Sequence, residues 1–325
     1  MSETKASPFT SAVVGAIRRL YPESLADKSF DNTGLLLEAP HRPGIRNSVL
    51  LTIDLTKAVA DEAILRKDST IITYHPIIFR GLKSLTLANT QQTTLLRLAQ
   101  EGISVYSPHT AVDAAPGGLN DFLADIVSGD FYRNNVNSRI ESSPHTRNVI
   151  TPIETPPTGC DTAGYGRILR FPTAVPLGIL LSRITQGLGN LDAVSVAVPQ
   201  WIPQGEKHNI NISSIGICAG SGGHMLGNLD VDLLFTGELS HHEALAAIEQ
   251  GRCCITAFHS NSERAFLANV MRPRLLVQLE KMVEQQEIDE MTDRDKSDLA
   301  GGFEVAVSKV DRDPFEIIAA GQTGW

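Results

Sequence analysis

Short apolar segments alternate with helical segments along most of the chain, and this alternation restricts the fold more than any other feature. Ser48–Ile53 has the pattern of a strand, Thr56–Lys67 that of a one-sided helix, and Ser69–Thr73 that of the next strand. Asn89–Glu101 and Ile103–Tyr106 continue the alternation. Strands separated by helices indicate βαβ units and a largely parallel sheet. We therefore expect an α/β protein.

A polar, proline-rich stretch between Asn134 and Thr162 interrupts this alternation and predicts a linker. At roughly 150 residues per domain, a chain of 325 residues suggests two lobes. We expect an N-terminal α/β lobe over 1–140, a linker over 141–162 and a C-terminal α/β lobe over 163–325. The remaining predictions are helices over 9–20, 177–186 and 240–249, a long helix over 263–285 broken or bent at Pro273, strands over 168–171, 193–198, 214–218, 231–235 and 253–258, a charged surface excursion over 288–299 and an edge strand over 303–310.

The charge and hydropathy of the chain exclude several classes of partner. The formal net charge is -9 and the sequence pI is about 5.5, which argues against direct nucleic-acid binding, because such proteins normally carry a basic patch. No apolar run approaches the ~20 residues that span a bilayer, so no membrane association is expected. The polar N-terminus lacks the pattern of a signal or transit peptide. We expect a cytoplasmic protein, with the nucleus or the mitochondrion as alternatives.

Three histidines occupy equivalent places in this pattern. His75, His109 and His259 each directly follow a short apolar strand. Open α/β sheets place their ligand sites at the carboxyl ends of their strands, where side chains distant in sequence converge. Any one of these histidines alone is more simply a polar loop residue. Three in matching positions indicate a site.

Carboxylates follow two of these histidines at helical spacing. Asp113 lies four residues after His109, and Glu263 lies four residues after His259. Residues i and i+4 share one face of a helix, so each pair can reach a single ion. Imidazole and carboxylate ligands without thiolate favour Zn²⁺, Mn²⁺, Fe²⁺ or Co²⁺. Carboxylates can also bridge two ions, an arrangement that activates water for hydrolysis.

Several other residues have two possible roles each. Glu238 ends a predicted strand and is either a general base or an anchor for a ligating histidine. Asp54 ends another strand and either faces the site or caps a helix. The turn containing Ser221 and Gly222 is either a backbone nest for phosphate or an ordinary tight turn. His242 stands beside another histidine on a predicted helix, and only one of the two can face the site.

Several ordered motifs resemble the NGG-one-interacting-factor-three-like (Nif-three-like) family, which includes GTP cyclohydrolase type 2 homologues. The motifs span roughly Phe9 to Leu267 and are, in order, Asp31-Asn32-Thr33-Gly34-Leu35, Tyr74-His75-Pro76-Ile77-Ile78-Phe79, His109-Thr110-Ala111-Val112-Asp113, Gly164-Tyr165-Gly166-Arg167, Ala219-Gly220-Ser221-Gly222-Gly223, Thr236-Gly237-Glu238, and His259 with Glu263. The resemblance implies a two-lobed fold with mixed, largely parallel sheets, a metal cavity between the lobes, and assembly into a hexamer.

The same resemblance implies two divalent ions per subunit. His75, Asp113, His259 and Glu263 are then the ligands, with Glu263 as the bridge. His109 belongs to the same motif as Asp113 and is either a further ligand or a residue that supports one. Many bacterial members have two consecutive histidines where this chain has Tyr74-His75, so the second ion loses a ligand.

Two functions follow from this resemblance. One is a metal-dependent hydrolase that acts on a phosphorylated or nucleotide-like small molecule, with Glu238 managing protons. The other is a non-catalytic metal-binding scaffold that contacts a protein partner in transcription.

Overall fold

The computed structural model describes residues 5–133, 138–285, 299, 301–319 and 321–322, and the predicted excursion over 288–299 lies almost entirely outside these residues. The chain forms two compact units. Unit 1 consists of residues 1–115, 155–161 and 266–311, and unit 2 consists of residues 116–154, 162–265 and 312–325. The helices and mixed sheets confirm the predicted α/β class.

Unit 1 is built on a five-stranded sheet with the order β1-β4-β3-β2-β11. Its strands and helices are β1 (Gly34–Leu37), β2 (Ser48–Thr52), β3 (Thr70–Thr73), β4 (Ser104–Ser107), β11 (Glu304–Val307), α1 (Pro8–Leu20), α2 (Lys57–Arg66), α3 (Thr90–Glu101), α4 (His109–Ala114) and α10 (Arg272–Glu284), with a short 3₁₀ helix over Glu23–Leu25. β11, β2, β3 and β4 run parallel, and β1 pairs antiparallel with β4. The edge strand predicted over 303–310 is therefore confirmed.

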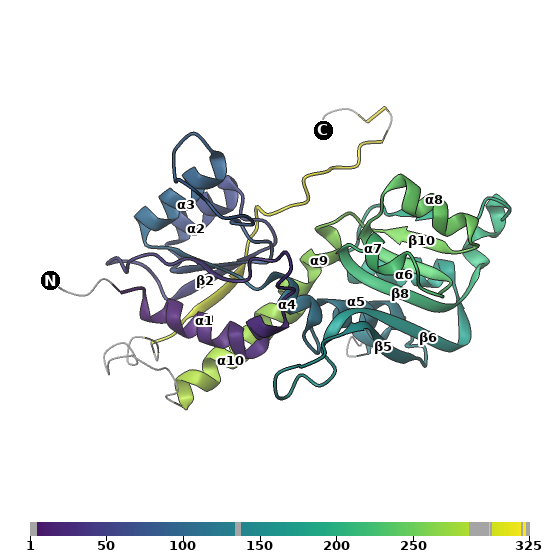
Figure 1. Ribbon diagram of the computed structural model, residues 1–325, viewed down its shortest axis with the longest axis horizontal. Helices are drawn as coiled ribbons and strands as arrows, with labels where there is room; N and C mark the ends of the chain where they lie inside the picture. The colour runs from purple at the N-terminus through teal and green to yellow at the C-terminus, as the bar shows by residue number, and fades with distance from the viewer. Residues whose placement is uncertain (1–4, 134–137, 286–298, 300, 320, 323–325) are drawn as a thin grey trace. The chain divides into compact units, whose positions relative to one another are not determined.

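Helices cover both faces of this sheet. α2 and α3 lie on one face, and α1 and α10 lie side by side on the other (Figure 1). On the α2 and α3 side, apolar residues of the strands and helices form one buried cluster, which includes Leu50, Ile71, Val59, Ala63 and Leu98. The strands are buried on both faces, as parallel strands of α/β proteins normally are. Their carboxyl ends consequently form a rigid edge for the side chains that follow.

Unit 2 is built on a six-stranded mixed sheet with the order β5-β6-β8-β9-β10-β7. Its strands and helices are β5 (Thr146–Pro152), β6 (Gly164–Pro176), β7 (Ser195–Ala197), β8 (Asn211–Ser221), β9 (Leu233–Glu238), β10 (Cys253–Thr256), α5 (Leu119–Ser128), α6 (Leu177–Gly187), α7 (Gly223–Leu226), α8 (His241–Glu249) and α9 (Asn261–Phe266), with 3₁₀ helices over Asp130–Tyr132 and Gln204–Asn209. β8, β9 and β10 run parallel, and the other pairs are antiparallel. The parallel strands again present their carboxyl ends at one edge.

The division into units differs from the predicted one in two respects. The predicted linker over 141–162 contains β5, which pairs antiparallel with β6 as an edge strand. Its mostly exposed residues conceal the strand, because an edge strand needs little apolar sequence. Residues 266–311 return to unit 1, because α10 packs against α1 and β11 pairs with β2.

The long helix predicted over 263–285 is three successive segments. α9 is followed by a π-helical turn over Leu267–Met271 and then by α10, with Pro273 in the first turn of α10. Proline has no N–H to donate to the preceding turn, so the hydrogen-bond pattern changes there. The predicted irregularity at Pro273 is thus a π turn placed just before it.

Candidate metal centre

In unit 1, His75 lies beyond the carboxyl end of β3, and Asp54 lies beyond the end of the neighbouring strand β2. The backbone pairing continues past both strands, because the His75 N–H donates to the Ile53 carbonyl at 3.0 Å. His75 Nδ1 lies 2.9 Å from Asp54 Oδ1. An ionised carboxylate only accepts, so Nδ1 carries the proton and Nε2 keeps its lone pair for a metal. Thr56, rather than Asp54, caps α2.

His109 has the same arrangement with a carboxylate that its spacing in the sequence does not identify. Its Nδ1 lies 2.7 Å from Asp31 Oδ1, and the Asp31 side chain is fully buried. Asp31 Oδ2 also accepts hydrogen bonds from the Thr33 hydroxyl and from the Thr110 N–H and hydroxyl. Burial alone would raise the pKa of Asp31, but the hydrogen bonds and the charge of His109 outweigh it, and the pKa is lowered to about 2. Asp31 thus stays ionised and orients His109.

Tyr74 and Asp113 complete the group in unit 1. The Tyr74 ring lies edge-on to the rings of His75 and His109, with centroids 5.0 and 5.5 Å away, and the two histidine rings are 5.5 Å apart. The Tyr74 hydroxyl donates to Asp113 Oδ1 at 2.7 Å. Four residues singled out from the sequence are therefore neighbours, and the phenol holds the Asp113 carboxylate in place.

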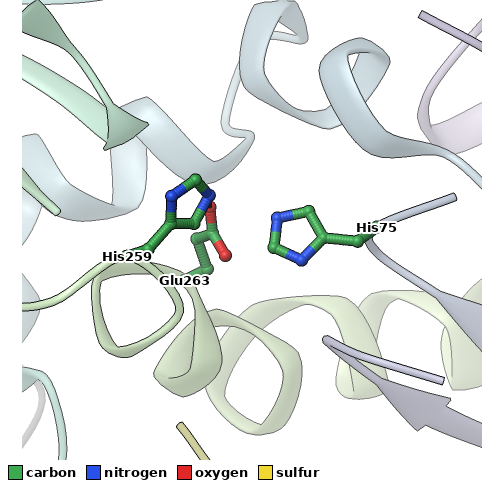
Figure 2. Close-up of side chains that lie close together, drawn as sticks. All are labelled: His75, His259 and Glu263. Carbon is green, nitrogen blue, oxygen red and sulfur yellow. Dashed lines mark ion pairs between the residues drawn. The ribbon is translucent and has the colours of Figure 1, made fainter. Parts of the chain in front are cut away.

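In unit 2, His259 and Glu263 present their ligand atoms together, as predicted from their i, i+4 spacing. His259 Nε2 lies 3.4 Å from Glu263 Oε1, and Glu263 is 2% exposed (Figure 2). Two ligand atoms about 2.1 Å from one ion at the tetrahedral angle are about 3.4 Å apart. The geometry of this pair therefore fits a metal ion.

Glu238 supports His259 as Asp54 supports His75. Glu238 Oε1 lies 3.0 Å from His259 Nδ1, so this ring also has its Nε2 available. Of the two roles expected for Glu238, general base or anchor of a ligating histidine, this contact supports the anchor. The residue before His259, Phe258, has a φ of +66°, and His109 has a φ of +29°. Such conformations cost about 1–3 kcal/mol for residues other than glycine and cluster at functional sites.

The turn over 220–223 packs against the proposed ligands His259 and Glu263. The Gly220 N–H donates to the Ser262 hydroxyl at 2.9 Å, and the Gly222 N–H donates to the Thr236 hydroxyl at 3.0 Å. These two amides therefore bind side chains of the protein itself, which favours the ordinary tight turn over the phosphate nest of the two alternatives. Gly220 instead lies against the ligands, since a Cβ there would be 2.8 Å from Glu263 Oε1 and 2.9 Å from His259 Nε2.

The remaining predicted residues lie at the surface. His242 is exposed in the first turn of α8, where its ring contacts His241 with centroids 5.3 Å apart. Ser221 is exposed and pairs with Glu238 in the ladder between β8 and β9.

Within the part of the chain that the structure describes, a His/His/Glu set of ligand groups is available to a metal ion. His75 belongs to unit 1, and His259 and Glu263 belong to unit 2. Sequence reasoning missed Asp31 and Gly220 in these supporting roles. Both belong to motifs that it had singled out, but neither role follows from spacing. No helix in the described residues is long and apolar enough to cross a membrane.

The profile of the Duf34/NIF3 (NGG1p interacting factor 3) family matches residues 10–294. The chain belongs to this family. It is 46% identical over 268 residues to the protein NIF3 homolog of Schizosaccharomyces pombe, covering 82% of this chain and 89% of that protein. It is 36% identical over 317 residues to NGG1-interacting factor 3 of Saccharomyces cerevisiae, covering 94% and 96%. The resemblance found in the sequence is thereby confirmed.

Two solved structures have the same fold. The Bacillus cereus protein related to NIF3 superposes with a TM-score of 0.67 at 19% identity, covering 94% of this chain and 98% of that chain. Staphylococcus aureus protein SA1388 superposes with a TM-score of 0.66 at 24% identity, covering 96% and 100%.

Proposed function

We propose that this NIF3-family protein binds two divalent ions per subunit, drawn from Zn²⁺, Mn²⁺, Fe²⁺ and Co²⁺. The proposed ligands are His75, His109 and Asp113 of unit 1 and His259 and Glu263 of unit 2, which together serve one dinuclear centre. The observation that carries the proposal is the carboxylate beside Nδ1 of each of the three histidines. Ligating histidines are normally oriented in this way, and a surface histidine has no need of it.

The function that such a centre supports best is hydrolysis of a phosphorylated or nucleotide-like small molecule. Divalent ions would supply Lewis acidity and lower the pKa of water. In this proposal the exposed Glu238 carboxylate accepts a proton directly from the attacking water while its Oε1 orients His259, and the exposed Ser221 contacts the anionic group of the substrate. Tyr74 holds the Asp113 carboxylate in place with its single hydroxyl hydrogen.

A second candidate function is a non-catalytic scaffold in which the metal rigidifies an oligomer, here a hexamer. Two observations favour it. The Saccharomyces cerevisiae relative is named for its interaction with NGG1, which suggests a protein partner in transcription. Tyr74 also occupies a position where a second consecutive histidine would add a ligand. We place the protein in the cytoplasm, with exchange to the nucleus required only by the scaffold function.

The test of the metal centre is the metal content per subunit of the purified protein, measured by mass spectrometry of the elements. It is compared with His259→Ala, Glu263→Ala and the control His208→Ala, which removes an exposed histidine of the same unit. Two ions per subunit, lost in the first two variants and kept in the control, are expected. An equal metal content in all four proteins would refute the proposed ligands.

Turnover distinguishes the two functions. The metal-loaded protein is screened against phosphoesters and nucleotides, and each positive reaction is repeated after chelation and after reloading. A hydrolase loses turnover on chelation and regains it on reloading. A scaffold shows no turnover of any of these compounds, but its oligomeric state or its affinity for a protein partner changes when the metal is removed.

A further inference from the structure

A short segment after β11, Ser308–Asp313, is fixed by hydrogen bonds of its own. The Ser308 hydroxyl donates to Glu62 Oε2 at 2.6 Å and accepts from the N–H groups of Val310 and Asp311. The Lys309 N–H donates to Glu62 Oε1 at 3.1 Å. The segment is therefore a defined turn, and the direction of its acidic side chains is set by the backbone.

The first of these side chains, Asp311, contacts the end of β2. Its Oδ2 accepts the Ile53 N–H at 2.7 Å. Ile53 is directly followed by Asp54, the carboxylate beside His75, and its carbonyl accepts the His75 N–H. Asp311 thus fixes the backbone of Ile53, the residue that precedes Asp54 and whose carbonyl pairs with the His75 N–H.

The second side chain, Asp313, contacts the turn that holds the ligands of unit 2. Its Oδ2 accepts the Ser260 hydroxyl at 2.7 Å, and its Oδ1 accepts the Phe315 N–H at 2.9 Å. Ser260 directly follows His259, and its carbonyl accepts the N–H of Glu263 at 3.1 Å. Asp313 and Ser260 are both buried, at 9% and 2% exposed, so this hydrogen bond is shielded from water.

We infer that Asp311 and Asp313 are positioning residues for the metal ligands, each acting through one hydrogen bond on the backbone or side chain next to a ligating histidine. Asp311 supports His75, and Asp313 supports His259. Only Arg312 separates them, so their Cα atoms are at most about 7 Å apart. One short segment of the C-terminal region thus supplies both positioning side chains. This inference rests on the proposed metal centre.

Asp→Ala and Asp→Asn substitutions separate this positioning role from anchoring and from an effect of charge. If the segment only anchors the C-terminal region, its loss lowers stability and leaves metal affinity unchanged. If the two aspartates act through negative charge near a cation, Asp→Asn lowers affinity as much as Asp→Ala does. If they act through the hydrogen bond, Asp→Asn keeps one oxygen that can accept from Ile53 or from Ser260 and preserves affinity, although Asp313→Asn gives up the acceptor for the Phe315 N–H.

The experiment titrates Co²⁺ into the chelator-treated full-length protein and follows the visible absorption, whose shape reports the coordination geometry. The variants are Asp311→Ala, Asp313→Ala and the corresponding Asn substitutions. The control is Asp232→Ala, because Asp232 Oδ2 accepts the N–H groups of Ser213 and Ser214 at 2.8 and 2.9 Å at the opposite end of β9. Thermal unfolding of the metal-free proteins is measured in parallel.

We expect each Ala variant to bind Co²⁺ about 10-fold to 100-fold more weakly than the wild type, with an altered spectrum, which is the usual effect of losing a residue that orients a ligand. The Asn variants should restore the wild-type affinity and spectrum. Asp232→Ala should lose thermal stability and keep both.

Wild-type affinity and spectrum in the Ala variants would overturn the inference and leave the metal centre standing. Equal losses in Ala and Asn variants would also overturn it, in favour of charge. A wild-type protein that binds no Co²⁺ would refute the metal centre itself.

Discussion

Gly220 allows a sharp test of the metal ligands, because its missing side chain leaves the space in which two of them lie. A Cβ at this position would be 2.8 Å from Glu263 Oε1 and 2.9 Å from His259 Nε2. An ordinary contact begins at 3.4 Å, so Gly220→Ala requires a shift of 3.4 − 2.8 = 0.6 Å at Glu263 Oε1. Ligand distances in metal sites are normally kept within about 0.2 Å. The displacement therefore exceeds what coordination tolerates.

The substitution also strains the backbone, and this effect needs a control. Gly220 has a φ of +62°, where a residue with a Cβ costs about 1–2 kcal/mol. Gly251 has a φ of +81° in the same unit, but a Cβ there would meet only the Trp201 ring at 3.8 Å. Both Ala variants should lose about 1–2 kcal/mol of unfolding free energy from strain. Gly220→Ala should lose about 1–3 kcal/mol more from overpacking.

The assay combines urea unfolding of the metal-free proteins with metal titration of the same samples. We expect Gly220→Ala to bind metal at least about 10-fold more weakly, or about 1.4 kcal/mol, and Gly251→Ala to bind as the wild type does. Wild-type affinity in a folded Gly220→Ala protein would refute the reasoning. It would mean that His259 and Glu263 do not hold the ion in the positions that the structure gives them.

Three further predictions concern stability and the supporting residues. The pKa of Asp31 in the folded protein is about 2, below its ordinary value of 3.8. The ionised Asp31 therefore stabilises the fold fully above about pH 4, and this contribution is lost as the pH falls through about 2. This shift of the pKa corresponds to about 2 kcal/mol of unfolding free energy. Asp31→Asn should therefore make the loss of unfolding free energy between pH 6 and pH 2 about 2 kcal/mol smaller than in the wild type, as measured by urea unfolding at both pH values. Arg167 is 2% exposed and donates to both oxygens of Asp121 at 2.7 and 2.8 Å, so Arg167→Ala should cost about 3–5 kcal/mol in urea unfolding, because it leaves a carboxylate poorly compensated. Glu238→Ala should weaken metal binding about 10-fold by freeing the His259 ring, and Glu238→Gln should weaken it less, as titration calorimetry can determine.

The sequence predicted the parts of the site that depend on local pattern. His75 and His259 could be found because each follows the carboxyl end of a parallel strand, although the two strands belong to different sheets. Glu263 could be found because helical spacing places it beside His259. Most of the strand and helix predictions succeeded for a similar reason, since the centres of the buried strands are apolar and most helices are one-sided.

The sequence could not predict features that depend on contacts between distant segments. Asp31 meets His109 across 78 residues, and no pattern in either segment predicts the other. β5 was missed because an exposed edge strand has the composition of a linker. Residues 266–311 belong to unit 1 because β11 pairs with β2. The local sequence of β11 predicts an edge strand but does not determine which sheet edge it joins.

Asp54 and Glu238 make the same contact with the Nδ1 atoms of His75 and His259, but the backbone brings each pair together in a different way. In unit 1, Thr52 pairs with Thr73, so Asp54 and His75, each two residues further on, come opposite one another by register alone. In unit 2, Thr236 pairs with Thr256, and the same count places Glu238 opposite Phe258 instead of His259.

A slip of one residue along a strand turns a side chain to the other face, so His259 would point away from Glu238 if the strand simply continued. The left-handed conformation of Phe258, with a φ of +66°, ends the extended backbone at that residue, and His259 Nδ1 comes to lie 3.0 Å from Glu238. The strain at Phe258 is therefore explained as the local distortion that compensates for the register of β9 and β10.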